Sequence, residues 1–199
     1  MNQPMRRVGM FGGAFDPPHR AHVALARAAV QQLELERLYV LPTGDAWHKS
    51  RTLSPAQDRL AMARLAFAAL PAVQVDDREL RRTGPTYSVE TLRELQAEHP
   101  GAQLHLLMGE DQAAGFSRWH AWQEIAALAV LCVAGRGCGE GLAALRALPG
   151  VRVEVLRLPQ MPESATDIRA RLTGNKDVGE LVGPAVAGYI ESQHLYQNT

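Results

Sequence analysis

A glycine-rich segment at residues 12–22 most constrains what this chain can fold into. It follows a short apolar run at residues 8–11, which is typical of a buried strand. It precedes apolar side chains spaced three and four residues apart, which predict a helix: Val23, Ala26, Val30 and Leu33. The segment is therefore expected to be a strand-to-helix loop. Its two glycines would let the backbone turn tightly and approach a ligand closely, with Asp16 as the N-cap and Pro17 as the first helical residue.

The start of such a helix favours an anion such as phosphate, because its N–H groups are unpaired and its dipole is positive there. His19 and His22 lie three residues apart on the expected first turn, so both imidazoles can face the same anion. Two plainer interpretations remain open, a capping turn with two surface histidines or half of a zinc site. The sequence contains no second Cys and His cluster at zinc spacing, and the phosphate site is favoured.

This segment resembles the Gly-Gly-x-Phe-x-Pro-x-His-x-x-His signature of the nucleotidyltransferase superfamily of adenylyl- and cytidylyltransferases. The matching residues are Gly12, Gly13, Phe15, Pro17, His19 and His22. Ala21 stands where many members have glycine. The resemblance implies a Rossmann-like fold and a reaction of ATP with Mg²⁺. It also implies ATP contacts along the loop, from Gly12, Gly13, Ala14, Phe15, His19 and His22.

Apolar runs alternate with helical patterns along the rest of the chain. Further strands are expected at residues 38–41, 73–75, 104–108, 129–134 and 151–155. This alternation predicts an α/β fold with a doubly wound, mainly parallel sheet in a single domain spanning 1–199, whose helical part from about residue 160 binds phosphate. Ligands of such sheets bind beyond the carboxyl ends of the strands, so the loops after Phe11, Leu41, Met108 and Leu158 should meet at one edge.

Residues 163–169 form a second candidate phosphate site. Ser164 or Thr166 would cap a helix whose first turn carries Arg169, which would bring hydroxyl, N–H and guanidinium donors together. An ordinary capped helix with a surface arginine is the alternative. The segment resembles the Ser-x-Thr-x-Ile-Arg element near the C-terminus of the same superfamily. That resemblance implies contacts from these three residues to the β- and γ-phosphates, and a catalytic role for Arg169 together with His19 and His22.

A third group of residues points to a flat heterocycle. Gly109 and Asp111 follow an expected strand, and Asp111 can hold ribose hydroxyls or a base edge. Trp119 and Trp122, three residues apart, are expected to share a helical face on which a ring could stack, with packing in the core as the alternative. The pattern resembles the Gly-x-Asp…Trp-x-x-Trp of the nicotinate-nucleotide adenylyltransferases, in which the first tryptophan stacks on the pyridine ring. His120 stands where family members commonly have tyrosine.

Residues 79–92 resemble the Glu-x-x-Arg-x-Gly-x-Ser-Tyr-Thr-x-x-Thr-Leu element of that family. Thr86 and Ser88, at a helix start, can receive a carboxylate without a salt bridge, although an ordinary capped helix is equally compatible. The resemblance implies that the mononucleotide is bound by Asp16, Thr86, Tyr87, Ser88, Trp119, His120 and Trp122. Residues 48–49 match a His-Lys/Arg pair of the family, and Lys49 can touch the triphosphate or be a solvated surface lysine.

Composition excludes several other classes of protein. Lys+Arg and Asp+Glu are both 21, and there is no basic stripe, so no nucleic-acid partner is expected. Apolar runs are too short to span a bilayer, and the first residues lack the apolar core of a signal peptide. The two cysteines, Cys132 and Cys138, do not suggest a disulfide scaffold, so a cytoplasmic location is expected. Oligomeric state stays open.

The combined resemblance implies a reaction of nicotinate mononucleotide with ATP that gives deamido-NAD and pyrophosphate. No protein side chain is expected as a metal ligand, since Mg²⁺ would be held by substrate and water. Alternatives are the same reaction with nicotinamide mononucleotide, adenylyl transfer to another phosphate such as phosphopantetheine, and a non-catalytic nucleotide sensor. A Walker-type NTPase is disfavoured because the sequence has no Gly-x-x-x-x-Gly-Lys-Ser/Thr.

Overall fold

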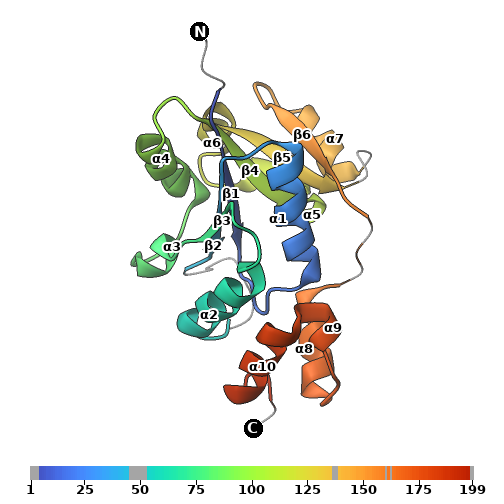
Figure 1. Cartoon of the computed structure of the whole chain (residues 1–199). Helices are drawn as coiled ribbons and strands as arrows, with labels where there is room; N and C mark the ends of the chain where they lie inside the picture. The colour runs from blue at the N-terminus through green and yellow to red at the C-terminus, as the bar shows by residue number, and fades with distance from the viewer. Residues whose placement is uncertain (1–4, 45–52, 136–138, 160, 162, 198–199) are drawn as a thin grey trace.

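The computed structural model describes residues 5–44, 53–135, 139–159, 161 and 163–197. Six strands form one sheet in the order β3-β2-β1-β4-β5-β6, and every neighbouring pair is parallel (Figure 1). The strands are β1 (Arg7–Gly13), β2 (Arg37–Pro42), β3 (Val73–Val75), β4 (Gln103–Gly109), β5 (Ala129–Gly135) and β6 (Val153–Arg157). This sheet confirms the predicted α/β, doubly wound fold.

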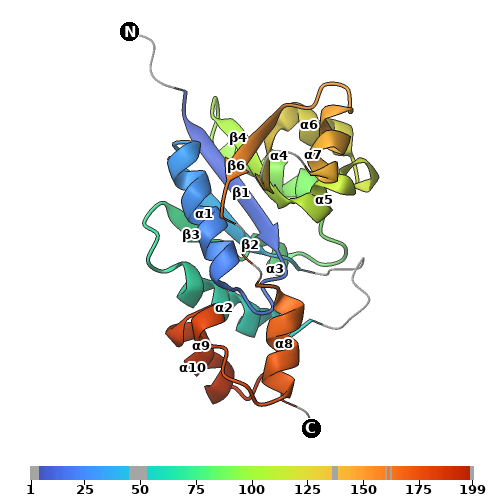
Figure 2. The ribbon, with the colours of Figure 1, turned by 90° about the vertical axis from the view of Figure 1, so that its right-hand side faces the viewer.

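Helices cover both faces of the sheet (Figures 1 and 2). One face packs against α1 (Arg20–Gln32) and α2 (Ala56–Phe67). The other packs against α4 (Ser88–Glu98), α6 (Trp122–Leu128) and α7 (Glu140–Arg146). The short helices α3 (Arg78–Arg81) and α5 (Glu110–Ala114) and the 3₁₀ turn η1 (Phe116–Arg118) connect these layers.

Central strands are apolar along their whole length because both of their faces are buried. In β5, Leu131 and Val133 point to the apolar cluster under α4 and α6, whereas Val130 and Cys132 point to the cluster under α1. This two-sided burial explains why the strands appear in the sequence as continuous apolar runs rather than as alternating patterns.

The sheet reverses its direction of growth between β1 and β4. From β1 the chain adds β2 and β3 on one side and then crosses over to add β4, β5 and β6 on the other. Val8 of β1 consequently lies beside Arg37 of β2 and Leu104 of β4. Connections diverge at such a switch point, which leaves a crevice at the carboxyl ends of the two strands.

A small helical layer follows β6 and lies beneath the carboxyl end of the sheet, next to α2 (Figures 1 and 2). It consists of α8 (Ala165–Thr173), α9 (Gly179–Val182) and α10 (Pro184–Ser192). Met62 of α2 joins the apolar side chains of this layer in a separate cluster: Ile168, Val178, Val182, Val186 and Ile190. Within the described residues, no helix combines the length and the apolarity needed to cross a membrane.

Two expectations about the first loop are wrong. The helix α1 begins at Arg20 with His19 as N-cap, not at Pro17 with Asp16 as N-cap. Pro18 explains the difference, because the residue before a proline is disfavoured in the helical conformation. Gly12 and Gly13 both belong to β1 and have no positive φ; the left-handed residue of the loop is Phe15, with φ 48°. The glycines therefore end the strand, and the turn follows them.

Candidate active site

A cavity of about 600 Å³ opens at the switch point, beyond the carboxyl ends of β1 and β4. It gathers predicted site residues from four separate segments: Gly12, Gly13, Ala14, Thr86, Tyr87, Ser88, Asp111, Trp119 and His120. Residues that the sequence analysis did not single out for the site also line it, among them Thr43, Glu79, Gln112, Gly115 and Arg118. A cavity of this size, with aromatic walls and a few polar groups, fits a small-molecule ligand.

Gly44, just beyond the end of β2, packs closely against the cavity wall at Glu79 and Thr86. A Cβ on Gly44 would overlap the carbonyl oxygen of Glu79 and would lie 2.8 Å from the Thr86 hydroxyl oxygen. Only glycine allows this approach without a shift in the wall. The Oγ1 atom of Thr86 is itself buried and has no hydrogen-bond partner among the described residues. A ligand in the cavity could supply that partner.

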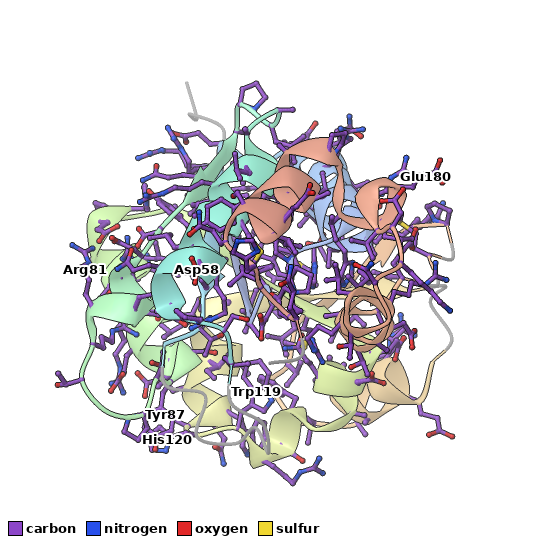
Figure 3. The ribbon with its side chains drawn as sticks, turned by 90° about the horizontal axis from the view of Figure 1, so that it is seen from below. Asp58, Arg81, Tyr87, Trp119, His120 and Glu180 are labelled. Carbon is purple, nitrogen blue, oxygen red and sulfur yellow. The ribbon has the colours of Figure 1, made fainter. Side chains whose placement is uncertain are left out.

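Two rings stack at the edge of the cavity. Tyr87, the N-cap of α4, and His120, which lies between η1 and α6, have ring centroids 4.2 Å apart and planes inclined by 34°. Figure 3 shows the two side chains together, with Trp119 nearby. Their side chains come from separate segments, so the stack ties the start of α4 to the segment that carries Trp119.

The two tryptophans do not share a helical face, contrary to the expectation from their spacing. Trp119 ends η1 in an extended conformation, Ala121 is left-handed with φ 52°, and Trp122 begins α6. Both rings pack against Phe116, with ring centroids 5.6 Å away for Trp119 and 6.1 Å away for Trp122. Trp119 also lines the cavity, whereas Trp122 is not part of its lining. Of the two tryptophans, only Trp119 therefore offers a stacking surface to the cavity.

A buried carboxyl group lies in the cavity wall. Glu79 is only 3% exposed, and its Oε1 accepts a hydrogen bond of 2.8 Å from the Thr91 hydroxyl. Burial raises the pKa of Glu79 to about 7, which the Thr91 hydrogen bond and the charge of Arg82 oppose. Near neutral pH this group is consequently balanced between its neutral and its charged form.

The two histidines of the first motif pack against each other. Their ring centroids are 3.7 Å apart, and the backbone N–H of His19 donates to Nδ1 of His22 over 3.2 Å. This contact is the half of a capping box that a glutamate or glutamine usually makes. Because Nδ1 accepts, the proton of a neutral His22 ring is on Nε2, where it can be donated to an anion.

His19 is buried in the N-cap position, with 6% of its surface exposed. Burial lowers the pKa of His19 to about 4, an effect that the nearby charge of Glu163 only partly offsets. The ring is therefore neutral at pH 7 and acts as a hydrogen-bonding group rather than as a cation. Its Nδ1 atom has no hydrogen-bond partner among the described residues.

The second segment that is predicted to bind phosphate lies against the first. Ser164 caps α8: its hydroxyl accepts from the Asp167 N–H at 3.1 Å and donates to the Asp167 carboxylate at 2.7 Å. Arg169 donates to the carbonyl oxygen of Asp16 over 2.7 Å and to the Thr166 hydroxyl over 3.2 Å. A direct hydrogen bond thus joins segments 153 residues apart in the sequence.

Asp16 lies at the centre of this junction rather than in the cavity wall. Asp16 is 1% exposed, and its two carboxylate oxygens accept from the backbone N–H of Ser54 at 3.2 Å and from the Tyr196 hydroxyl at 2.5 Å. Arg59, buried on α2, adds a second link by donating to three carbonyl oxygens, those of Ala14, Thr43 and Ser54. Sequence reasoning missed Arg59 and Tyr196, because neither carries a motif and no pattern marks an arginine as buried.

The site therefore has two parts. The cavity is one, and His19, His22 and Arg169 around residue 16 are the other. The predicted residues outside the cavity lining are Phe15, Asp16, His19, His22, Gly109, Trp122, Ser164, Thr166 and Arg169. Phe15 is buried and packs edge-on against Phe11 and Phe67, which anchors the loop. Lys49 falls outside the described residues, and within them no three His, Cys, Asp or Glu side chains are grouped to hold a metal ion.

A switch-point cavity beside a helix start with imidazole and guanidinium groups defines a nucleotide-binding α/β protein. The sequence model of the cytidylyltransferase-like family matches residues 10–171, and the chain belongs to this family, as one of its nicotinate-nucleotide adenylyltransferases. It is 55% identical over 196 residues to a protein of Albidiferax ferrireducens named "probable nicotinate-nucleotide adenylyltransferase", covering 97% of this chain and 99% of the relative. The protein of that name from Methylibium petroleiphilum is 41% identical over 199 residues, covering 97% and 93%.

Solved structures agree with the fold. The Plasmodium falciparum nicotinic acid mononucleotide adenylyltransferase complexed with NaAD matches with a TM-score of 0.77, covering 96% of this chain and 97% of that one. Sequence identity there is 17%, so this comparison carries the fold alone. The fold and the family that the sequence resemblance implied are both confirmed.

Proposed function

We propose that this chain transfers the adenylyl group of ATP to nicotinate mononucleotide, releasing pyrophosphate and forming deamido-NAD for NAD biosynthesis. One observation carries the proposal: an aromatic-walled cavity and a separate imidazole–guanidinium cluster adjoin the same strand-to-helix loop. Such a site suits two nucleotides whose phosphates meet over the loop. The names of the relatives support the same substrates.

The reaction needs little from the protein beyond positioning and charge stabilisation. The attacking group is a phosphate oxygen with a second pKa of about 6, so it is anionic at neutral pH and no strong general base is required. Attack on the α-phosphorus of ATP in line with the leaving pyrophosphate develops charge on the phosphate oxygens. His19 and His22 would donate hydrogen bonds there, and Arg169 with Ser164 and Thr166 would hold the β- and γ-phosphates.

Mg²⁺ would accompany ATP and reduce the repulsion between the phosphates. The Asp16 carboxylate, the acidic side chain of the loop itself, already accepts two hydrogen bonds through its two oxygens. This occupancy fits an ion that is held mainly by phosphate oxygens and water. A cytoplasmic location stays the expectation drawn from the cysteines; of these, Cys132 is a buried free thiol, and Cys138 lies outside the described residues.

The cavity would hold the pyridine nucleotide. Trp119 offers a face on which the ring can stack, and the Thr86 hydroxyl offers an unpaired polar atom to the carboxylate. The helix start at Ser88 adds N–H groups that favour a negative charge. Asp111 on the cavity wall would contact a ribose.

The test is pyrophosphate release with ATP and Mg²⁺, with nicotinate mononucleotide, nicotinamide mononucleotide and phosphopantetheine assayed in parallel. We expect kcat/KM for the acid to exceed that for the amide at least a hundredfold, which is about 2.7 kcal/mol. Equal rates would keep the adenylyl transfer and overturn the assignment of the carboxylate-binding wall. Turnover with phosphopantetheine alone would replace the acceptor, and ATP binding without any turnover would indicate a sensor.

A further inference from the structure

We infer that Tyr196 is a positioning residue for ATP, acting through Asp16 on Arg169. The inference rests on the proposed function, because it assigns the part of the site formed by His19, His22 and Arg169 around residue 16, here called the phosphate side, to ATP. Tyr196 lies in the C-terminal tail, beyond the last residue of α10, and no motif points to it. Its partner Asp16 lies 180 positions earlier, in the loop that leads to His19.

The contact is a hydrogen bond to a buried charge. The Tyr196 hydroxyl donates to Oδ1 of Asp16 over 2.5 Å, and the Ser54 N–H donates to Oδ2 over 3.2 Å. Burial, followed by the bond to Asp16, raises the pKa of Tyr196 above its ordinary value, so the phenol keeps its proton and remains a donor. Hydrogen bonds to an ionised acceptor are among the stronger ones in proteins, particularly where water is excluded.

Residue 16 connects this bond to the phosphate side. Its side chain is held by Tyr196, and its backbone carbonyl accepts from Arg169 over 2.7 Å. A rotation of residue 16 would therefore move the acceptor that orients the guanidinium. Since Asp16 also precedes the histidine pair by only a few residues, the same rotation would change how His19 enters α1.

The tail is positioned independently of this hydroxyl. Tyr189 on α10 donates to Asp58 on α2 over 2.8 Å, and the apolar cluster around Met62 includes the rings of both tyrosines. Loss of the Tyr196 hydroxyl should consequently leave the helical layer in place while releasing the Asp16 side chain. This separation makes Tyr189 a matched control, since its hydroxyl contacts α2 and not the loop.

The experiment compares Tyr196→Phe with Tyr189→Phe in the full chain. We expect Tyr196→Phe to raise KM for ATP about tenfold with less than a twofold change in KM for nicotinate mononucleotide. Tyr189→Phe should change neither KM by more than twofold, whatever it does to the thermal midpoint. Equal effects of the two variants, equal effects on the two substrates, or no effect of Tyr196→Phe would each overturn the inference.

A double-mutant cycle with Asp16→Asn tests the connection itself. Because both substitutions weaken the same bond, their effects on KM for ATP should be strongly non-additive, and additive effects would contradict the inference. Calorimetric titration of MgATP into the wild type and Tyr196→Phe measures MgATP affinity directly. It therefore distinguishes failure of the inference about Tyr196 from failure of the proposed function. Wild-type protein that releases no pyrophosphate would sink the function, whereas unchanged MgATP affinity in Tyr196→Phe would sink the positioning role.

Discussion

The two parts of the site are built by different kinds of interaction. The aromatic cavity wall at Tyr87 and Trp119 packs on the apolar cluster under α4 and α6, so it is fixed by the packing of the main core. On the phosphate side, Asp16, Arg169 and Tyr196 come from distant segments and meet through polar contacts. Substrate binding in the cavity should therefore be insensitive to substitutions outside the cavity. Binding on the phosphate side should instead be sensitive to the loss of a single hydrogen bond.

Arg59 is the structural link between the two parts. Its guanidinium binds the carbonyl oxygens of Ala14 and Thr43, which line the cavity, and that of Ser54, whose N–H reaches Asp16. One buried cation thus joins the loop after β1 to both ends of the connection between β2 and α2. Its cost of burial is offset by these charge-assisted hydrogen bonds.

The largest effect is expected on the phosphate side. His22→Ala removes the donor that we propose for the reacting phosphates, and it also removes the acceptor that holds the His19 N–H. We predict a loss of a hundredfold to a thousandfold in kcat with the fold intact, because one charge-stabilising donor typically contributes on that order. Steady-state pyrophosphate release and a thermal melt measure the two quantities.

A matched control is His99→Ala. His99 follows the last residue of α4 and forms a hydrogen bond of 2.9 Å with the Tyr39 hydroxyl. It belongs neither to the cavity lining nor to the phosphate side of the site. We expect this variant to keep the kcat of the wild type, even if its thermal midpoint is lower. Near-normal kcat in His22→Ala would end the role assigned to the imidazole.

An intermediate effect is expected in the cavity, where the two tryptophans should separate. Trp119→Ala removes the stacking face and should raise KM for nicotinate mononucleotide about tenfold while leaving KM for ATP within twofold. Trp122→Ala should change KM little, because Trp122 is outside the cavity lining, and should lower the free energy of unfolding by about 2 kcal/mol, because its ring packs on Phe116. Urea unfolding and initial rates distinguish these outcomes, and a similar KM for both variants would contradict the assignment.

Sequence patterns predicted the sheet well, because buried strands and helix starts are local features. The apolar run before Gly12 became β1, and the residues after Ser164 became a capped helix. The tryptophan pair failed because spacing alone does not reveal the left-handed residue at Ala121 that separates η1 from α6. Local periodicity indicates which residues form an element, but not where an element is interrupted.

Polar contacts between distant segments could not be predicted. Nothing in residues 195–197 indicates that Tyr196 reaches Asp16, since the contact depends on how the helical layer packs on α2. Arg59 likewise follows no apolar period, and its burial depends on three carbonyl oxygens, one from the loop after β1 and two from the connection between β2 and α2. The resemblance therefore found the residues of the motifs and missed the residues that hold them in place.

The smallest effect concerns pH and the cavity wall. Burial raises the pKa of Glu79 to about 7, so its carboxyl group is neutral below that pH and gains a negative charge above it. A raised pKa stabilises the fold below the ordinary value of 4.5, and this contribution is lost as the pH rises through about 7. The new charge should also repel a carboxylate in the cavity, so the ratio of kcat/KM for the acid to that for the amide should fall about threefold between pH 6 and 8.

Glu79→Gln should flatten this dependence, because the amide oxygen can still accept from Thr91 but the side chain no longer titrates. The phosphates of the two mononucleotides titrate alike and cancel in the ratio. His120 lines the same cavity, so His120→Asn is the matched control and should leave the slope due to Glu79 in place. Two results would contradict this prediction: a ratio that stays constant with pH in the wild type, or a ratio that falls equally in Glu79→Gln. Either would show that the charge of Glu79 does not affect how the cavity binds the carboxylate.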